Sequence, residues 1–147
     1  MTRLEDSFVV PFERSFDAHY GLEYLSAGEG EARGRVAVTA AHLGADGTVQ
    51  SGVYAAMAES LASTGTAVEV VPAGFFPSGL SNSTHVVGGA RDGVLEAVAR
   101  CRARGELEWL WDVEIGPPGG APTALATVAI AIRPVRPKKT CEAAATG

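Results

Sequence analysis

A single carboxylate stands in a long stretch of small and apolar residues. Between Asp46 and Glu69, Glu59 is the only acidic or basic residue. Its side of a helix would be shared by small or weakly polar neighbours: Gly52, Ala55, Ala56, Ser63 and Thr66. A solvated helix face normally repeats its charges every three or four residues, so this pattern departs from that of an ordinary solvent-facing glutamate. A partly desolvated carboxylate with room beside it can act as a base or nucleophile, and Glu59 is our first candidate.

A second chemical element is expected where this helix begins. The segment "GTVQSG" precedes it, so the free amides of Ser51, Gly52 and Val53 should point outward at the positive end of the helix dipole. Such amides can stabilise a developing oxyanion. Glu59 lies two turns further along, roughly 10–12 Å by the helical rise. Both groups can therefore act on one substrate only if it lies along the helix or if another chain completes the site.

These groups depend on one long helix, predicted from about Ser51 to Val71. Apolar residues recur near helical spacing and alanine fills much of the rest, while Pro72 ends the pattern. Strand-like segments lie on both sides. Residues 21–27 and 32–40 predict a hairpin about the turn "GEGE", and after the loop "AGFFPSG" four further strands are predicted at 80–87, 93–104, 106–115 and 123–134. Glycine or proline at each boundary predicts hairpin connections, and hence an antiparallel meander.

Alternation assigns a face to the residues of two of these strands. In the strand at 106–115, Trp109 and Trp111 are expected on an inward face, in the core or an interface, together with Leu107, Val113 and Ile115. In the strand at 93–104 the inward residues are mostly small, which lets a helix come close, and the outward ones are Glu96, Arg100, Arg102 and Arg104. One helix can cover only one face of such a sheet, so the uncovered face or edge must be solvated or paired with another subunit.

Composition narrows the class of protein. The chain has 147 residues, 46% of them hydrophobic, which suits one domain over 1–147 with a core at about 21–134 and a terminal tail at 135–147. No apolar run is long enough to span a membrane and no secretory signal is evident, so we expect a cytoplasmic protein. Two cysteines without a paired motif predict neither disulfides nor a metal site. The net charge of −5 argues against nucleic acid as a partner.

The helix and its strands together resemble a known family. An antiparallel sheet wrapped round one long helix that opens with "VQSGVYAAMAES" is similar to the hotdog-fold acyl-CoA thioesterases of the PaaI and 4-hydroxybenzoyl-CoA thioesterase type, whose signature reads V-H-G-G-x-x-x-x-L-A-[DE]-S. The likeness extends from about Gly21 to Pro134 and implies an α+β hotdog fold. The acid of the signature falls on Glu59, and a hydroxyl that the family often carries one turn later falls on Ser63.

The resemblance implies hydrolysis of an acyl-CoA or aroyl-CoA thioester without a cofactor, coenzyme A being part of the substrate. The amide of Ser51 or Gly52, helped by Gln50, would polarise the carbonyl, while Glu59 of a partner subunit attacks it or activates water. Ser63 would position the water or Glu59. The chain departs from the family pattern at three positions: Gln50 replaces the signature's histidine, Ser51 its first glycine, and Gly44 an upstream glutamine.

Coenzyme A carries phosphates, so basic residues are candidates for binding it. In "GLSNSTHVVGGARDG", His85 matches a histidine of 1,4-dihydroxy-2-naphthoyl-CoA and enterobactin-type proofreading thioesterases, and Arg91 lies in the basic loop that follows. Arg136, just past the last strand, is a further candidate, whereas a solvated strand face and a basic tail would explain the other arginines and lysines. His19 and His42 are expected at the surface. Phe75 and Phe76 are expected either to line an acyl pocket or to anchor the loop after the helix.

Three functions therefore compete. We expect a hotdog homo-oligomer, a homodimer or a tetramer made of two dimers, with thioesterase activity. A non-catalytic acyl-CoA-binding or regulatory protein on the same fold is the alternative, favoured by the lost histidine and glutamine. A hydratase ranks last, because hotdog hydratases usually use an Asp/His pair near the helix start and Gln50 supplies no histidine.

Overall fold

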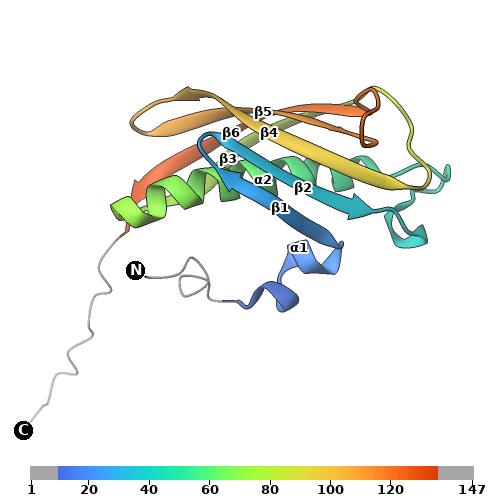
Figure 1. Ribbon diagram of the computed structural model, residues 1–147, viewed down its shortest axis with the longest axis horizontal. Helices are drawn as coiled ribbons and strands as arrows, with labels where there is room; N and C mark the ends of the chain where they lie inside the picture. Colours follow the sequence, from blue (N-terminus) through green and yellow to red (C-terminus); the bar gives the residue numbers. More distant parts are fainter. Residues whose placement is uncertain (1–9, 136–147) are drawn as a thin grey trace, which may run out of the picture.

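The computed structural model describes residues 10–135, in which a six-stranded antiparallel sheet curves over one long helix (Figure 1). The sheet order is β1-β2-β4-β5-β6-β3. Its strands are β1 (Leu22–Gly28), β2 (Glu31–Ala37), β3 (Phe75–Val86), β4 (Val94–Arg104), β5 (Glu108–Gly116) and β6 (Ala124–Pro134). The helix is α2 (Ser51–Val70), and shorter turns form η2 (Phe12–Arg14), α1 (Phe16–His19), η3 (Ala40–His42) and η4 (Val71–Ala73). This is the predicted α+β hotdog fold.

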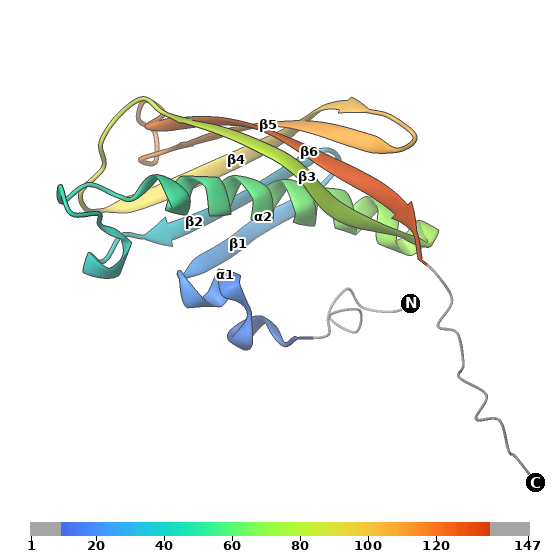
Figure 2. The same ribbon diagram turned by 180° about the vertical axis from the view of Figure 1, so that it is seen from behind.

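The long helix begins and ends close to the predicted positions. Gln50 is its N-cap residue, and Val70 is its last residue before η4, where Pro72 occupies the first turn. Proline has no N–H to continue the α-helical ladder, and Gly74 then turns the chain with a φ of 86°. The chain passes directly from this turn into β3, which lies along the same helix (Figure 2).

The core lies between the concave face of the sheet and α2. Trp111, Tyr54, Met57 and Leu61 are fully buried there, and Trp109 is nearly so, which confirms both tryptophans as core residues. Each such large side chain contributes about 1.5–3 kcal/mol by leaving water. Small residues let the two layers approach closely: Ala97 and Ala99 of β4 are fully buried.

The predicted start and pairing of β3 were wrong. The segment Phe75–Gly79, expected as a loop, belongs to the strand, which accommodates Pro77 because β3 is an edge strand bonded only to β6. The connection after β3 is not a hairpin, since β4 pairs with β2 and β5. β2 and β5 occupy the two sides of β4, and β3 pairs with β6 instead.

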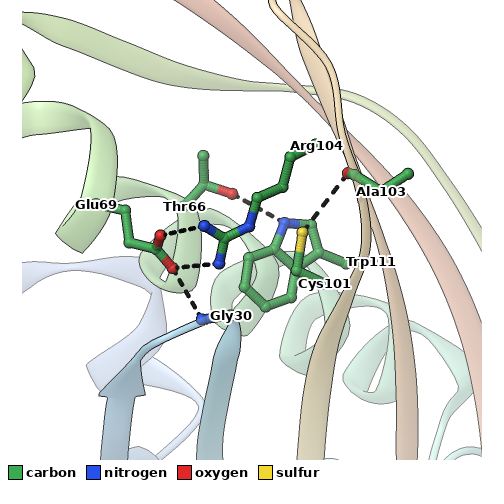
Figure 3. A network of polar contacts seen from close by, with 7 residues as sticks. All are labelled: Gly30, Thr66, Glu69, Cys101, Ala103, Arg104 and Trp111. Atoms are coloured by element: carbon green, nitrogen blue, oxygen red, sulfur yellow. Dashed lines mark hydrogen bonds and ion pairs between the residues drawn. The ribbon is translucent and has the colours of Figure 1, made fainter.

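The register of β4 shifts near its end and reverses one predicted orientation. A bulge between Cys101 and Ala103 places Arg104 opposite Trp109, on the concave face rather than the outer one. Its guanidinium lies 4.6 Å from the Trp109 ring centre and 2.7 Å from a carboxylate oxygen of Glu69 on α2. Figure 3 shows that Glu69 also accepts the Gly30 amide of the β1–β2 turn. Through Glu69, the end of α2 is thus linked to Arg104 of the β4–β5 hairpin and to the turn of the β1–β2 hairpin.

Two further expectations fail for local reasons. Leu107 is exposed because it lies in the turn between β4 and β5, before the alternation begins. His42 is buried rather than at the surface: its Nδ1 accepts the Thr39 amide at 2.9 Å and its Nε2 donates to the Tyr20 carbonyl at 2.8 Å. His42 therefore ties η3 to the end of α1.

The outer face of the sheet carries paired charges, as expected for a solvated strand face. Arg100 lies 3.2 Å from Glu31 and 3.7 Å from Glu114, and Arg102 lies 3.8 Å from Asp112. Exposed pairs of this kind contribute little to stability, about 0–1 kcal/mol. Within residues 10–135 no helix is long and apolar enough to cross a membrane.

Candidate active site

Glu59 lies on an exposed side of α2, next to the edge strand β3. Its side chain is exposed within one chain, which contradicts the prediction that the carboxylate is partly desolvated. It borders a cavity of about 1060 Å³. The carboxylate lies against Gly79 of β3, where a Cβ atom would be only 2.5 Å from Glu59 Oε1. The absence of a side chain at Gly79 leaves the space that the carboxylate occupies.

Small residues surround Glu59 as predicted, except at one position. Ala55, Ala56 and Ser63 remain partly accessible on this face. Thr66, however, is fully buried: its hydroxyl donates to the Ala62 carbonyl at 2.8 Å and accepts from Trp111 Nε1 at 2.9 Å (Figure 3). The sheet covers more of the C-terminal half of α2, where Trp111 reaches the helix.

Ser63 lines the same cavity as Glu59, one turn further along α2. The hydroxyls of Ser60 and Thr64 border it as well. The structure therefore brings together the predicted acid and the predicted hydroxyl.

The amide of Gly52, a predicted oxyanion donor, already has a partner. Gln50 Oε1 accepts it at 2.6 Å, as a side-chain cap of the helix. This contact uses the Gln50 side-chain oxygen as the acceptor. The N–H groups of Gln50 Nε2 are therefore the donors that this side chain can offer to a ligand. Within residues 10–135 the Ser51 amide has no hydrogen-bond partner, and the Ser51 side chain is exposed. The donors that remain at the start of α2 are thus the Ser51 N–H and the Gln50 Nε2 group.

The helix start and Glu59 lie far apart along one chain. Glu59 follows Gln50 by nine residues of α2, a rise of about 13 Å. A thioester carbonyl held at the helix start cannot also contact the carboxylate of the same helix. The two predicted halves of the site are therefore not brought together within one chain.

Arg91 lies beside the loop that leads into α2. Its guanidinium approaches the Asp46 carbonyl at 3.5 Å, and a Cβ on Gly47 would be 3.2 Å from it. The Thr48 amide and hydroxyl, together with the Arg91 charge, lower the pKa of the Asp46 carboxyl. The neighbouring Val49 amide bonds to the Ala90 carbonyl at 2.8 Å, which holds the two loops together. A positive charge is thus placed near the start of the helix.

His85 is not brought to this region. It is exposed on β3 and pairs in register with Leu125, whose side chain is also exposed. Asn82 and Thr84 alternate with it and face the helix, since Asn82 donates to the Ala55 carbonyl at 2.9 Å and accepts from Thr84. His85 therefore points to the opposite face of the sheet from Glu59. Arg136 lies outside the described residues.

Phe75 and Phe76 do not border the cavity beside Glu59. Both are exposed on β3, and Phe76 lines a separate hollow with Arg133, Pro134 and Val135. They therefore neither anchor a loop nor line this pocket. Across residues 10–135, no three His, Cys, Asp or Glu side chains are grouped to hold a metal ion.

The sequence did not reveal a polar cluster at the edge of the same cavity. Asp17 of α1 accepts hydrogen bonds from Ser60 at 2.6 Å, from Tyr24 at 2.7 Å and from Tyr20 at 3.3 Å. Burial raises the pKa of both tyrosines, so their hydroxyls stay protonated and donate. Ser15, which caps α1, is a local signal for that short helix. The cluster itself has no such local signal, because the partners of Asp17 lie up to 43 residues away.

Known proteins share both sequence and fold with this chain, although no protein-family model matches it. Over 102 residues it is 33% identical to a Mycobacterium tuberculosis protein named "Putative esterase Rv1847", covering 68% of this chain and 73% of that protein. The solved structure of that esterase superposes with a TM-score of 0.79 at 30% identity, covering 83% of this chain and 98% of the other. A glutamine-to-alanine mutant of thioesterase PA1618 from Pseudomonas aeruginosa also gives 0.79, at 23% identity and coverage of 84% and 88%.

Proposed function

The chain belongs to the hotdog-fold thioesterase family, and on that basis we propose that it hydrolyses an acyl-CoA or aroyl-CoA thioester to the free acid and CoA. The observation that carries this proposal is the position of Glu59, the carboxylate that α2 places at the edge of a cavity whose other lining residues are apolar or hydroxyl-bearing, apart from Glu13 and Asp17. Such an environment suits a group that acts on a bound acyl compound. No cofactor is needed for this chemistry.

Glu59 acts on the thioester carbonyl in one of two ways. As a general base it accepts a proton from water while the water oxygen attacks the carbonyl carbon; the C–S bond then breaks and CoA leaves. As a nucleophile its own oxygen attacks the carbonyl carbon, the C–S bond breaks and CoA leaves as the thiolate; water then cleaves the resulting anhydride to give the free acid and restore the Glu59 carboxylate. Ser63 orients the water or the carboxylate. In both routes the negative charge that develops on the carbonyl oxygen is stabilised by the Ser51 N–H and Gln50 Nε2.

The site requires two copies of the chain. The rise of about 13 Å between Gln50 and Glu59 on α2 prevents one chain from supplying both groups to one carbonyl. We therefore expect a homodimer, or a tetramer built from two dimers, in which the helix start of one copy faces Glu59 of a second copy. Arg91, beside that helix start, contacts a CoA phosphate, and His85 and Arg136 remain candidates for the rest of the nucleotide.

The competing function is an acyl-CoA-binding protein without turnover. One observation favours it: Gln50 replaces the family's histidine and occupies the Gly52 amide that would otherwise serve an oxyanion. Such a protein would bind CoA esters and release no thiol.

A thiol-release assay separates the two functions. We would test aliphatic, phenylacetyl and hydroxybenzoyl CoA esters with the wild type, Glu59→Ala, and Glu106→Gln as a control at an exposed carboxylate away from the cavity. Loss of about 10² or more in Glu59→Ala, with binding and oligomeric state retained, supports the thioesterase. Tight binding of these esters without thiol release by the wild type supports the binding protein.

A further inference from the structure

One face of α2 forms the floor of the cavity beside Glu59. The floor residues recur at helical spacing over three turns: Ala56, Glu59, Ser60, Ser63, Thr64 and Val68. From Glu59 to Val68 the helix rises about 13 Å. The carboxylate therefore lies towards one end of an elongated hollow, and an apolar side chain lies at the other.

The wall opposite this floor comes from the segment before β1 and from β1 itself, and it presents aromatic rings beside the carboxyl groups of Glu13 and Asp17. Phe12 packs edge-on against Tyr24, with ring centres 6.1 Å apart, and Phe16 lies 5.1 Å from Tyr20. Phe12, Phe16 and Tyr24 all border the cavity, and both phenylalanines are exposed. Exposed aromatic rings facing a hollow provide apolar surface that a ligand can cover.

The wall is fixed to the floor by the Asp17 cluster. Asp17 accepts the Ser60 hydroxyl from α2 and the Tyr24 hydroxyl from β1, at 2.6 and 2.7 Å. Hydrogen bonds to a carboxylate are stronger than neutral ones, so α1 is held to two elements at once. The width of the hollow is thereby set by the fold rather than by a free terminal segment.

We propose that this cavity binds the acyl group of the substrate, and that it selects apolar acyl chains long enough to extend from Glu59 to Val68. This inference rests on the proposed function, since it places the thioester at Glu59. The cavity's volume of about 1060 Å³ is slightly above the range of about 300–1,000 Å³ typical of ligand pockets. A butanoyl group would leave the Val68 end unfilled, whereas a decanoyl group would cover Phe12, Phe16 and Val68.

The test narrows the far end of the cavity. Val68→Phe places a larger side chain there, and Phe16→Ala removes part of the wall. We expect wild-type kcat/KM to be about tenfold or more higher for decanoyl-CoA than for butanoyl-CoA, because filling an apolar pocket is worth that much. Val68→Phe should abolish this preference, because it should lower the decanoyl value by about tenfold or more relative to the butanoyl value. Phe76→Ala, an exposed phenylalanine outside the cavity, is the matched control and should alter neither value.

Binding of the non-hydrolysable decanoyl-CoA thioether, measured by calorimetry, makes the test independent of turnover. Tighter binding of the thioether than of CoA by the wild type, lost in Val68→Phe and weakened in Phe16→Ala, supports the acyl site even if no ester is hydrolysed. In that case the proposed thioesterase fails and the cavity assignment stands. Equal effects of Val68→Phe on the decanoyl and butanoyl values would overturn the assignment. Loss of both activities together with a changed oligomeric state would also overturn it, and would make the cavity a contact between copies. Equal binding of CoA and thioether by the wild type would overturn it as well.

Discussion

The Glu59 carboxylate occupies the space that a side chain at Gly79 would fill. A Cβ on Gly79 would be 2.5 Å from Glu59 Oε1 and 3.3 Å from its carboxyl carbon. Since the clashing atoms are the free end of a flexible side chain, Gly79→Ala should displace the carboxylate while costing little stability. We expect turnover to fall by about 10²-fold, as for loss of a positioned base, with the free energy of unfolding changed by less than about 1 kcal/mol.

Gly88→Ala supplies the control for that substitution. A Cβ there would meet Thr123 at 3.5 Å, an ordinary contact, in the loop that follows β3. Its activity should equal that of the wild type. Full activity of Gly79→Ala would show that the position of the carboxylate against β3 is irrelevant to catalysis.

Two substitutions at Gln50 should distinguish its role as a helix cap from its proposed role in catalysis. Its Oε1 accepts the Gly52 amide at 2.6 Å, so Gln50→Ala loses the cap and should lower the free energy of unfolding by about 0.5–1 kcal/mol. Gln50→Glu keeps an acceptor there and adds a charge that the helix dipole favours, so stability is retained. The same variant loses the Nε2 donors, and its turnover should fall by about 10²-fold or more. Urea unfolding and thiol release on both variants test this, and an active Gln50→Glu would remove Gln50 from the mechanism.

Local sequence signals were sufficient for elements whose cause is local. The helix could be predicted because apolar spacing and a breaker at Pro72 act within a few residues. The alternation that buried Trp109 and Trp111 is equally local. Glu59 became a candidate because its isolation among small residues is visible along one helix, and the structure places it beside a cavity.

Features that depend on pairing between distant segments were missed. The bulge beside Cys101 turns Arg104 inward only because β5 fixes the opposing register, and His42 is buried only because the Tyr20 carbonyl lies above it. The Asp17 cluster joins residues up to 43 positions apart. Alternation along β3 cannot be followed across its bulge at Gly79, and the predicted role of His85 came from resemblance rather than from geometry.

The tyrosines beside Asp17, buried Tyr20 and partly buried Tyr24, predict a loss of stability at alkaline pH. Burial raises the pKa of Tyr20 and Tyr24 above the ordinary value of 10.0, because it disfavours the phenolate. Their contribution to stability is complete below about pH 10 and is lost as the pH rises further towards the folded-state values. Each tyrosine should lower the free energy of unfolding by up to about 1.4 kcal/mol per pH unit in that range. Urea unfolding between about pH 9 and 11 should show a shallower decline in Tyr20→Phe/Tyr24→Phe, and equal slopes would contradict the assignment.

Replacing Gly65 with alanine should lower the free energy of unfolding, which is the opposite of the usual effect at a helical glycine. Alanine normally stabilises a helix interior by about 0.5–1 kcal/mol relative to glycine. Here a Cβ would be 2.5 Å from the Trp111 ring, which is fixed by its hydrogen bond to Thr66 and cannot withdraw cheaply. Overpacking of this kind costs about 1–3 kcal/mol, so Gly65→Ala should be destabilising overall. In a double-mutant cycle with Trp111→Phe, which removes the ring at the contact, the alanine should become neutral or stabilising. A Gly65→Ala protein as stable as the wild type would mean that helix and sheet can separate locally without loss.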